Sequence, residues 1–501
     1  MRPIHRTLIV LSFAFLLGAC ESLRPLPSGL SYLSTPKPAT DLTFSSDITY
    51  VDQRGQRQVH QEIFDHWFSL INKAQRFILI DMFLYNDFQG PMPEYHRALA
   101  QELTDRLVIK KQQNPEMRIA VITDPVNILY GGVLSTHFEQ LKGAGVEVHI
   151  TDLTKLRDSN PSWSYFWRLF IKSFGNHTNG RFTSHIQHPP VTLRSFLSFL
   201  NFKANHRKVL IADDGTDIAA MITSANAHDP SSAHTNISLS LRGPAAIDLL
   251  HTENAVLVFS GGRPFAIPNT QTKLSNHLTV QVATESRIRD QTLDEINSLQ
   301  AGAKLDIAMF FISHRGIIKA LKNAHKRGVI IRVLLDPNRS SLGLPRSGIP
   351  NRPVAVELDK AGIGIRWCVL NNEQCHSKFV LSQRTDGSVW MSLGSANLTR
   401  RSLDDYNLET NFIVVGKAHE TVFVDANKWF EMLWTNSGNR PFSKPFIAKE
   451  HRSFLRRIWY LFAEASGWST FQRNSFICSN ELRYKVKYFG FRNCMRNSLS
   501  L

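Results

Sequence analysis

The chain has 501 residues. This length exceeds one ordinary hydrophobic core and favours two domains of roughly 200 residues each. Hydrophobic residues make up 43% of the sequence, a share typical of globular proteins, which argues against disorder and against a polytopic membrane protein. The 58 Lys and Arg exceed the 42 Asp and Glu and give a formal charge of +16. That surplus favours polyanionic partners, either nucleic acid or anionic lipid headgroups.

The first 19 residues have the pattern of a secretory signal peptide. A basic start precedes an apolar run at residues 8–17 that is too short for a secure membrane span. The run leads into "LGAC", which resembles a bacterial lipobox with Cys20 as the lipidated residue. An ordinary signal peptide or a short anchor helix is the alternative. Glu21 follows the cysteine, which for such signals indicates an outer-membrane lipoprotein of the cell envelope, facing the periplasm.

Residues 20–40 are rich in Pro and Ser, and we expect them to form the lipid anchor and a flexible tether. A first domain then spans residues 41–260. Within it, "RFILIDMFLYND" (76–87) and "RIAVITDPVN" (118–127) are apolar runs typical of buried strands, and residues 97–113 between them have apolar positions at helical spacing. Strands that alternate with helices indicate α/β layers with largely parallel sheets.

An aromatic and basic insertion occupies residues 159–200 of the first domain. Two runs in it have apolar residues at i, i+3, i+4 and i+7: Trp163, Phe166, Trp167 and Phe170, then Leu193, Phe196, Leu197 and Leu200. Four basic residues are interspersed: Arg168, Lys172, Arg181 and Arg194. Such a stripe is more often buried core than a membrane or substrate contact, so we expect core and keep the contact as the alternative.

After the insertion, "NHRKVLIADD" carries His206, Lys208 and Asp213 at the spacing H-x-K-x4-D. Side chains at i and i+2 of a strand point the same way, so His206 and Lys208 share one face. The aspartate position, seven residues after the histidine, falls on the opposite face, where a structural hydrogen bond to nearby backbone is expected. A single His-x-Lys pair is weak, because a solvated strand end explains it as well.

A polar loop follows, with Ser224 and Asn226 at its start and Asn236 at its end. It also contains His228, Asp229 and His234, residue types that bind metals, but such residues are common in polar loops. We therefore expect no metal there.

A linker at 261–275 leads to a second domain, 276–440, that repeats this order. "KLDIAMFFISHR" (304–315), "IIRVLLDPN" (330–338) and "GIGIRWCV" (362–369) resemble the successive strand-like runs of the first domain. Self-similarity of this kind indicates two homologous α/β halves.

The second domain also repeats the polar motif. His376 and Lys378 match the first pair, but Gln383 stands at the aspartate position. The second-copy residues Ser395, Asn397 and Asn407 match Ser224, Asn226 and Asn236, and ten residues separate the two asparagines in each copy. The His-x-Lys pair thus occurs twice, each time followed by the same serine and asparagines. This repetition favours a functional motif over a solvated strand end.

An exported chain would hold its remaining cysteines in an oxidising compartment. The simplest of three pairings joins Cys368 to Cys375 and Cys478 to Cys494; four free thiols are the alternative. The C-terminal segment, residues 441–501, is basic and aromatic, and is either a cap on the fold or a membrane-surface segment.

Convergence of the two His-Lys pairs would make a site for phosphoryl transfer. Two imidazoles can act as nucleophile and general acid on opposite sides of one phosphorus. Two ammonium groups and two Asn amides can hold the non-bridging oxygens, a task that a metal performs elsewhere, so no cofactor is required.

The chain resembles the phospholipase D superfamily over residues 41–440, through the duplicated H-x-K motif and the α/β repeat. The stretch that follows the second motif, "GSANLTRRSLDDYNLETN" (394–411), is similar to the cardiolipin synthase branch of that superfamily. The resemblance implies two α/β/α sandwich halves related by a pseudo-twofold, with the active site at their interface. It implies a phosphohistidine intermediate, with His206 as nucleophile and His376 as general acid and then base. It assigns phosphate binding to Lys208, Lys378, Asn226 and Asn397.

The resemblance also suggests supporting residues around the histidines. Glu409 matches a position that orients a histidine through its second ring nitrogen. The first half has Ser238 there, so His206 is expected to be oriented by Asp229 or held less firmly. The full supporting set is Asp213, Glu409, Asp229, Ser224, Ser395, Asn236 and Asn407.

These observations predict a metal-independent phosphodiesterase or phosphatidyltransferase that acts on phospholipid at a membrane surface, with water or an alcohol as acceptor. A periplasmic endonuclease with the same chemistry is one alternative, because the net charge also suits nucleic acid. A non-catalytic protein that binds anionic lipid is the other.

Overall fold

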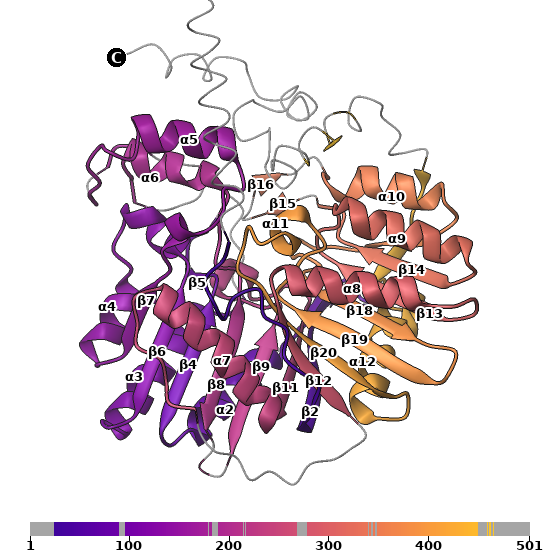
Figure 1. The fold of residues 1–501 in the computed structure, drawn as a ribbon, viewed down its shortest axis with the longest axis horizontal. Helices are drawn as coiled ribbons and strands as arrows, with labels where there is room; N and C mark the ends of the chain where they lie inside the picture. The colour runs from indigo at the N-terminus through magenta and orange to yellow at the C-terminus, as the bar shows by residue number, and fades with distance from the viewer. Residues whose placement is uncertain are drawn as a thin grey trace, which may run out of the picture.

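The computed structural model describes residues 25–89, 96–178, 180–182, 189–213, 215, 217–267, 278–338, 340–341, 344–345 and 348–448, together with 458, 460, 461 and 464. Two large β-sheets lie side by side at the centre, and helices surround them (Figure 1). The signal-peptide residues, Cys20, most of the linker and Cys478 and Cys494 lie outside the described residues.

The first sheet has eight strands, and its strand order is fixed by long apolar runs at its centre. In spatial order the strands are β3 (Arg57–His60), β2 (Thr40–Val51), β11 (Asn236–Arg242), β9 (Ile218–Thr223), β8 (Lys208–Asp213), β4 (Phe77–Met82), β6 (Arg118–Thr123) and β7 (Glu147–Ile150). The central strands β4, β8 and β9 are buried along their whole length, as expected for strands covered on both faces.

The second sheet has nine strands and repeats the central part of this order. Its strands are β1 (Lys37–Pro38), β12 (Thr279–Thr284), β20 (Thr410–Lys417), β19 (Ser388–Gly394), β18 (Lys378–Gln383), β13 (Lys304–Met309), β14 (Ile330–Leu335), β17 (Gly364–Cys368) and β21 (Ser443–Pro445). The segment β20-β19-β18-β13-β14-β17 corresponds to β11-β9-β8-β4-β6-β7. Two small sheets, β5 (Tyr85–Asn86) with β10 (Ala227–His228) and β15 (Ser340–Ser341) with β16 (Leu344–Pro345), complete the strands.

Helices pack on both faces of the sheets (Figure 1). In the first half they are α2 (Ile63–Lys73), α3 (Leu99–Gln113), α4 (Thr136–Gly143), α5 (Pro161–Phe170), α6 (Leu193–Ser198) and α7 (Pro244–Phe259). In the second half they are α8 (Ser286–Ser298), α9 (Arg315–Lys326), α10 (Asn351–Asp359), α11 (Arg400–Leu403) and α12 (Thr421–Thr435). Of these, α7 and α12 contribute to the core between the two halves. Short 3-10 turns are η1 (Pro125–Gly131), η2 (Leu153–Lys155), η3 (Phe199–Asn201), η4 (Asp229–Ser231) and η5 (Ser437–Asn439). Among the described residues, no helix combines the length and apolar character needed to cross a bilayer.

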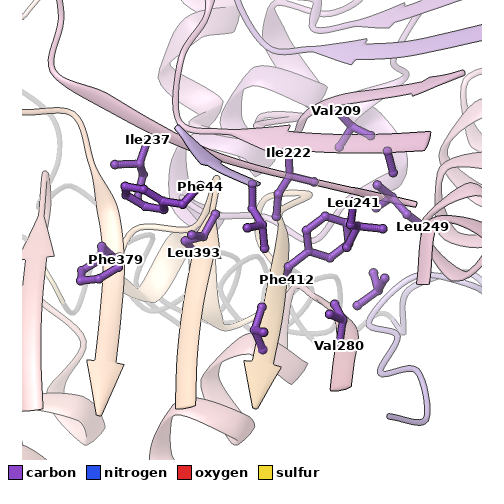
Figure 2. Packing of buried hydrophobic residues seen from close by; sticks show 14 of the residues in the cluster. Phe44, Val209, Ile222, Ile237, Leu241, Leu249, Val280, Phe379, Leu393 and Phe412 are labelled. Atoms are coloured by element: carbon purple, nitrogen blue, oxygen red, sulfur yellow. The ribbon is translucent and has the colours of Figure 1, made fainter. Parts of the chain in front are cut away.

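One hydrophobic core joins the two halves. Val209 and Ile237 of the first sheet belong to the same buried cluster as Phe379 and Leu393 of the second. These side chains meet between the sheets in Figure 2. Two further cores lie under the outer helices of each half. Because the shared core holds the sheets against each other, the loops at its edge are positioned by both halves.

The sheets are mixed, so the expectation of largely parallel sheets is wrong. Only β4-β6-β7 and β13-β14-β17 are parallel neighbours, and the other strand pairs of the two large sheets are antiparallel. The connection from β8 to β9 is only residues 214–217, which suits a hairpin and is too short for a parallel crossover.

Residues 31–38 also depart from the expected flexible tether. β1 pairs with β12, and Leu33 forms an isolated bridge with Ala283. The amide of Ser31 donates to Glu285 at 2.6 Å. The N-terminal segment therefore adds an edge to the second sheet, and backbone pairing overrides its Pro- and Ser-rich composition.

Asp213, expected to support the site, lies at the end of β8 farthest from His206. Its Oδ1 accepts backbone hydrogen bonds from Gln75, Arg76 and Phe77 at 3.3, 2.8 and 2.9 Å. It thereby fixes the entry into β4. Gln383, at the corresponding end of β18, donates to Asn427 at 3.1 Å. The motif aspartate is therefore a structural residue, and the second half has a different contact there.

Replacing Asp213 with Ala should lower the free energy of unfolding by about 3 kcal/mol, because three backbone amides, that of Phe77 buried, lose a charged acceptor. Gln383→Ala should cost below about 1 kcal/mol, since it removes one neutral hydrogen bond. Urea unfolding followed by circular dichroism measures both. Equal midpoints for Asp213→Ala and the parent would refute this role.

Candidate active site

The two His-x-Lys segments have the same local structure. Lys208 and Lys378 are the first residues of β8 and β18, and both are 1% exposed. Each ammonium group folds back onto the carbonyl of the histidine two residues earlier, at 2.6 Å for Lys208 and 2.7 Å for Lys378. Alternation along the strand thus places each lysine beside its own histidine, as the sequence predicted.

Backbone pairing carries each histidine across to the other half. The amide of His206 donates to Leu408 at 2.9 Å, and the amide of Leu408 donates to Ala204 at 3.0 Å. At the corresponding place in the second half, the amide of His376 donates to the carbonyl of Thr235 at 2.8 Å, and the amide of Thr235 donates to the carbonyl of Gln374 at 2.9 Å. Both histidines therefore lie where the halves meet, each bonded to the polar loop of the opposite half.

The side chains that hold the two rings also cross between the halves. His206 Nδ1 lies 2.9 Å from Glu409 Oε2, and the Ser395 hydroxyl donates to the same oxygen at 2.5 Å. His376 Nδ1 lies 3.2 Å from Asn236 Oδ1, to which the Ser224 hydroxyl donates at 3.0 Å. A carboxylate orients one imidazole and a neutral amide orients the other.

This geometry corrects the alignment of the two polar loops. Asn236 is the structural counterpart of Glu409, whereas the equal ten-residue intervals had paired Asn236 with Asn407 and Ser238 with Glu409. Twelve residues separate Ser224 from Asn236, but fourteen separate Ser395 from Glu409. The second loop is therefore longer by two residues. Matching the two asparagine pairs, which are equally spaced, aligned β11 with β20 two residues out of register.

Asn407 itself supports Glu409, because its amide donates to Oε1 at 3.5 Å. Ser238 lies on β11, and its hydroxyl has no hydrogen-bond partner among the described residues.

The expectation that Asp229 orients His206 is wrong. Its carboxylate accepts from the amide of Ala100 at the start of α3, 3.0 Å away. His228 is bonded to Ser231 at 2.7 Å and to the Phe88 carbonyl at 3.1 Å, while His234 Nδ1 accepts from Gln374 at 3.3 Å. These residues serve separate partners. Within the described parts of the chain, no group of three or more metal-binding side chains is found.

Several residues of the site were not identified from the sequence. Phe83 lies against His206 at a ring separation of 4.7 Å, and Phe310 lies against His376 at 4.8 Å. The ammonium groups of Lys208 and Lys378 lie 4.9 and 5.2 Å from the same two rings. Each phenylalanine follows a buried strand directly, so the repeat of an aromatic residue after that strand was the available signal.

The aspartates of the two Asp-Pro strand ends also support the site. Asp124 accepts from the amide of Asn205 at 2.8 Å, and Asp336 accepts from the amide of Cys375 at 2.9 Å. Each fixes the residue directly before a histidine. Burial raises the pKa of Asp124 to about 7. In the sequence, the two Asp-Pro pairs indicated only the ends of strands and gave no sign of a role beside the histidines.

Asn226 and Asn397 occupy matching positions in the two loops. The Oδ1 of Asn226 accepts from the amide of Leu84 at 3.4 Å, and that of Asn397 accepts from the amide of Phe311 at 3.2 Å. Because the oxygens bind backbone, each amide group has its NH₂ end left to donate.

A buried ion network lies behind the site. Arg207, between the motif histidine and lysine, is fully buried and donates to Glu253 at 2.9 Å and to Glu285 at 2.7 Å. The same oxygen of Glu285 accepts from the amide of Glu409 at 3.0 Å. Charges from both halves are therefore locked together next to the carboxylate that holds His206.

Burial dominates the electrostatics of the site. It lowers the pKa of His206 to about 4 against the opposing effect of Glu409, and lowers the pKa of Lys208 to about 7. Burial first, and then the charges of Lys378, His234, Lys208 and His206, hold the pKa of His376 well below its usual value. Burial and Lys208 likewise depress the pKa of Lys378. The two lysines therefore act on the histidine of the opposite half as well as on their own.

A disulfide joins Cys368 to Cys375, the residue before His376, as the simplest pairing predicted. It connects the end of β17 to the second His-x-Lys segment. The second predicted pair lies outside the described residues.

Comparison with known proteins supports the assignment of this fold. Residues 293–434, from α8 to α12, match the family described as "Cardiolipin synthase, PLD-like domain". This part of the chain is a phospholipase D-like domain. Phosphatidylserine synthase from Haemophilus influenzae matches with a TM-score of 0.52 at 11% identity, over 86% of this chain and 96% of that one. The phospholipase D family member Nuc from Salmonella typhimurium matches at 20% identity over 34% of this chain and 98% of that one, with a TM-score of 0.25. No curated protein sequence matches significantly.

The family match and the fold together confirm the resemblance to the phospholipase D superfamily. The matched region contains His376, Lys378 and Asn397, together with Glu409. The first half completes the fold with its own copy of the motif.

The ring of His206 should titrate with a pKa of about 4 and be neutral at pH 7, with its proton on Nδ1 facing Glu409. Glu409→Gln should lower this pKa further, because the carboxylate that favours imidazolium is removed. NMR of ¹⁵N-labelled histidine measures both quantities. Signals from the exposed His419 should stay unchanged, and an imidazolium at position 206 at pH 7 would contradict the expectation.

Proposed function

We propose that the protein is a metal-independent phosphodiesterase or phosphatidyltransferase that acts on phospholipids through a phosphohistidine on His206. The supporting observation is the crossed pair of hydrogen bonds in which Nδ1 of His206 donates to Glu409 and Nδ1 of His376 donates to Asn236. Each bond engages Nδ1, which leaves Nε2 of both rings for chemistry.

In the first step, Nε2 of His206 attacks the phosphorus, and the bond from phosphorus to the leaving oxygen breaks. His376, protonated in the complex, transfers its proton to that oxygen. The bound phosphodiester anion favours this protonation, since it offsets the positive charges that, after burial, depress the pKa of His376. The products are an alcohol and a phosphorylated His206.

In the second step, neutral His376 removes a proton from water or from an incoming alcohol. The resulting oxygen attacks the phosphorus, and the bond to His206 breaks. Water gives net hydrolysis and a lipid alcohol gives phosphatidyl transfer. Both histidines return to their starting state, so the cycle balances without a further reactant.

The unequal partners of the two rings support these roles. A ring that bonds to phosphorus through Nε2 while keeping Nδ1–H gains positive charge, and the buried carboxylate of Glu409 stabilises that charge. The amide oxygen of Asn236 accepts from Nδ1–H of His376 but carries no charge, so it does not stabilise imidazolium as a carboxylate would, and Nε2 of His376 can release and accept a proton readily. Glu409 therefore suits a nucleophile, and Asn236 suits an acid and base.

The remaining polar groups suit the phosphate oxygens. Lys208 and Lys378 supply positive charge from opposite halves, and Asn226 and Asn397 supply amide donors. Because these groups are held by backbone contacts before substrate arrives, they need little reorganisation as charge develops in the transition state.

Phospholipid is favoured over nucleic acid as the substrate by features outside the centre. The lipobox-like "LGAC" at residues 17–20 would tether the site to a membrane of the cell envelope. The family that residues 293–434 match is named after cardiolipin synthase, and cardiolipin is a phospholipid. A nuclease remains the second candidate, because the net charge of +16 also suits a nucleic-acid backbone.

Purified protein should turn over phosphatidylglycerol or phosphatidylethanolamine in the presence of EDTA. His206→Ala and His376→Ala should each lower this activity by at least about 10³-fold, since each removes a group that acts on the reacting atoms. Labelled lipids separated by chromatography, with plasmid DNA in parallel, measure the activity. A matched control is His419→Ala, on the surface. Nicking of DNA without lipid turnover would favour the nuclease, and no turnover of either would favour a binding protein.

The value of kcat/KM should fall by about a further tenfold per pH unit above pH 7, because Lys208 of the free enzyme has a pKa of about 7 and an anionic substrate binds its protonated form. This loss adds to the one from His376, whose pKa in the free enzyme is already well below its usual value. The bound anion raises that pKa, so kcat should persist to higher pH than kcat/KM. A soluble short-chain phosphodiester assayed across this range measures both. A kcat/KM that stays flat to pH 9 would contradict a role for Lys208 charge in binding.

A further inference from the structure

We propose that the described part of the insertion, residues 159–178, 180–182 and 189–200, is a docking surface for an anionic lipid membrane. The inference deepens the proposed function and rests on it, since it says how a phospholipid substrate would reach the site. Its occupant is a bilayer surface, and the argument uses exposure, charge and position.

The insertion displays aromatic side chains to solvent, so the expectation that its stripes form buried core is wrong. Of the ten residues of α5, only Ser164 is buried. Phe166, Phe170 and Phe174 are 45%, 57% and 66% exposed. Among the large hydrophobic side chains that are exposed in the described residues, all the phenylalanines belong to this insertion: Phe166, Phe170, Phe174, Phe182 and Phe199. Leu169 and Leu193 extend the same surface. Such a concentration marks an interaction site.

The polar backbone contacts of the insertion explain why it is ordered without a core. Asn160 donates to the Leu200 carbonyl at 3.3 Å, and Asn176 donates to the Tyr130 carbonyl at 2.9 Å. Asn176 in turn accepts from Thr192 and Ser195 at 2.5 and 3.1 Å. The bond to Tyr130 fixes the insertion to the body of the first half, and the others join its two helical parts, while Phe166, Phe170 and Phe174 face outward.

The charge of this surface suits anionic headgroups. Residues 159–200 contain no Asp or Glu. Lys172 and Arg181 are exposed, and among the described residues no carboxylate pairs with them or with Arg194. The fourth cation, Arg168, is paired with Asp158 at 2.8 Å. Phenylalanine that enters the headgroup region beside unpaired cations is the composition expected of an interfacial membrane contact.

The insertion leads directly into the site. α6 and η3 end at Ser198 and Asn201, and His206 follows within the same connection to β8. In Figure 1, α5 and α6 lie at the upper edge of the first half, the edge on which α11 of the Glu409 loop also lies. Arg401 of that loop donates to the Phe202 carbonyl at 3.5 Å. A bilayer that contacts the insertion would therefore lie beside the segment that leads to His206 and the loop that carries Glu409.

The test uses the full chain carrying Cys20→Ser, so that no acyl chain is attached. Sedimentation with vesicles of phosphatidylcholine, alone or mixed with phosphatidylglycerol, measures binding. Phe166→Ser, Phe170→Ser and Phe174→Ser combined should weaken binding to the mixed vesicles by about tenfold or more. Ile330→Ser, Val424→Ser and Val258→Ser, which remove three exposed apolar side chains elsewhere, should change it less than about twofold.

Charge is tested separately. Lys172→Ser with Arg181→Ser should remove most of the preference for the mixed vesicles, whereas Lys319→Ser with Lys326→Ser should not. Equal binding by the phenylalanine variants and the parent would overturn the proposal. Loss of plasmid binding in these variants without loss of vesicle binding would instead assign the surface to nucleic acid.

A soluble short-chain phosphatidylglycerol separates docking from chemistry. The phenylalanine variants should turn it over at the parent rate and lose turnover only on vesicles. If the parent binds vesicles through these residues but turns over neither form of lipid, docking stands and the proposed function fails. If turnover occurs and vesicle binding ignores the insertion, the proposed function stands and docking fails.

Discussion

The hydrogen bond between His206 and Glu409 is the contact on which the arrangement of the site depends. It joins an imidazole of the first half to a carboxylate of the second, and it lies inside a buried network. Ser395 and Asn407 hold the carboxylate, and Glu285 joins its backbone to Arg207. Neither half alone can position its own histidine. The shared core between the sheets is therefore a requirement for chemistry as well as for stability.

Burial also determines the protonation states of the basic groups in the site. Two lysines and two histidines are buried at the site, and burial shifts all of them toward their neutral forms. A bound phosphodiester would favour the protonated forms of both lysines and of His376, while His206 acts as the nucleophile in its neutral form. Binding and activation are then one electrostatic event, because the substrate anion favours the protonated forms that burial disfavours.

The sequence was sufficient for the features that repeat. The doubled His-x-Lys spacing located both histidines and both lysines, and the family resemblance placed them at an interface. The parts that failed depend on three-dimensional register. Equal spacing between asparagines hid a two-residue difference in loop length, so Asn236 was not recognised as the counterpart of Glu409. Asp229 lies in the polar loop after the first motif, but its carboxylate binds the start of α3 and does not reach His206. Asp213 belongs to the motif, but the length of β8 separates it from His206.

The insertion shows a different limit of sequence patterns. Periodicity identified its aromatic stripes but could not say whether protein or solvent lies opposite them, because a helical stripe looks the same in both cases. Exposure of Phe166 and Phe170 settles that question for the chain itself. The mixed sheets illustrate the same point, since alternation of strands and helices does not reveal which neighbours are hairpins.

The most direct test of the central claim is to trap the covalent intermediate. An activated p-nitrophenyl phosphodiester needs no general acid to leave, so His376→Ala should form the phosphohistidine yet hydrolyse it slowly for want of a base. Rapid quenching and peptide mass spectrometry should then show a burst of nitrophenol and phosphorus on His206. Phosphorus attached to another residue, or no adduct alongside normal turnover, would contradict the crossed arrangement of the two halves around one phosphate.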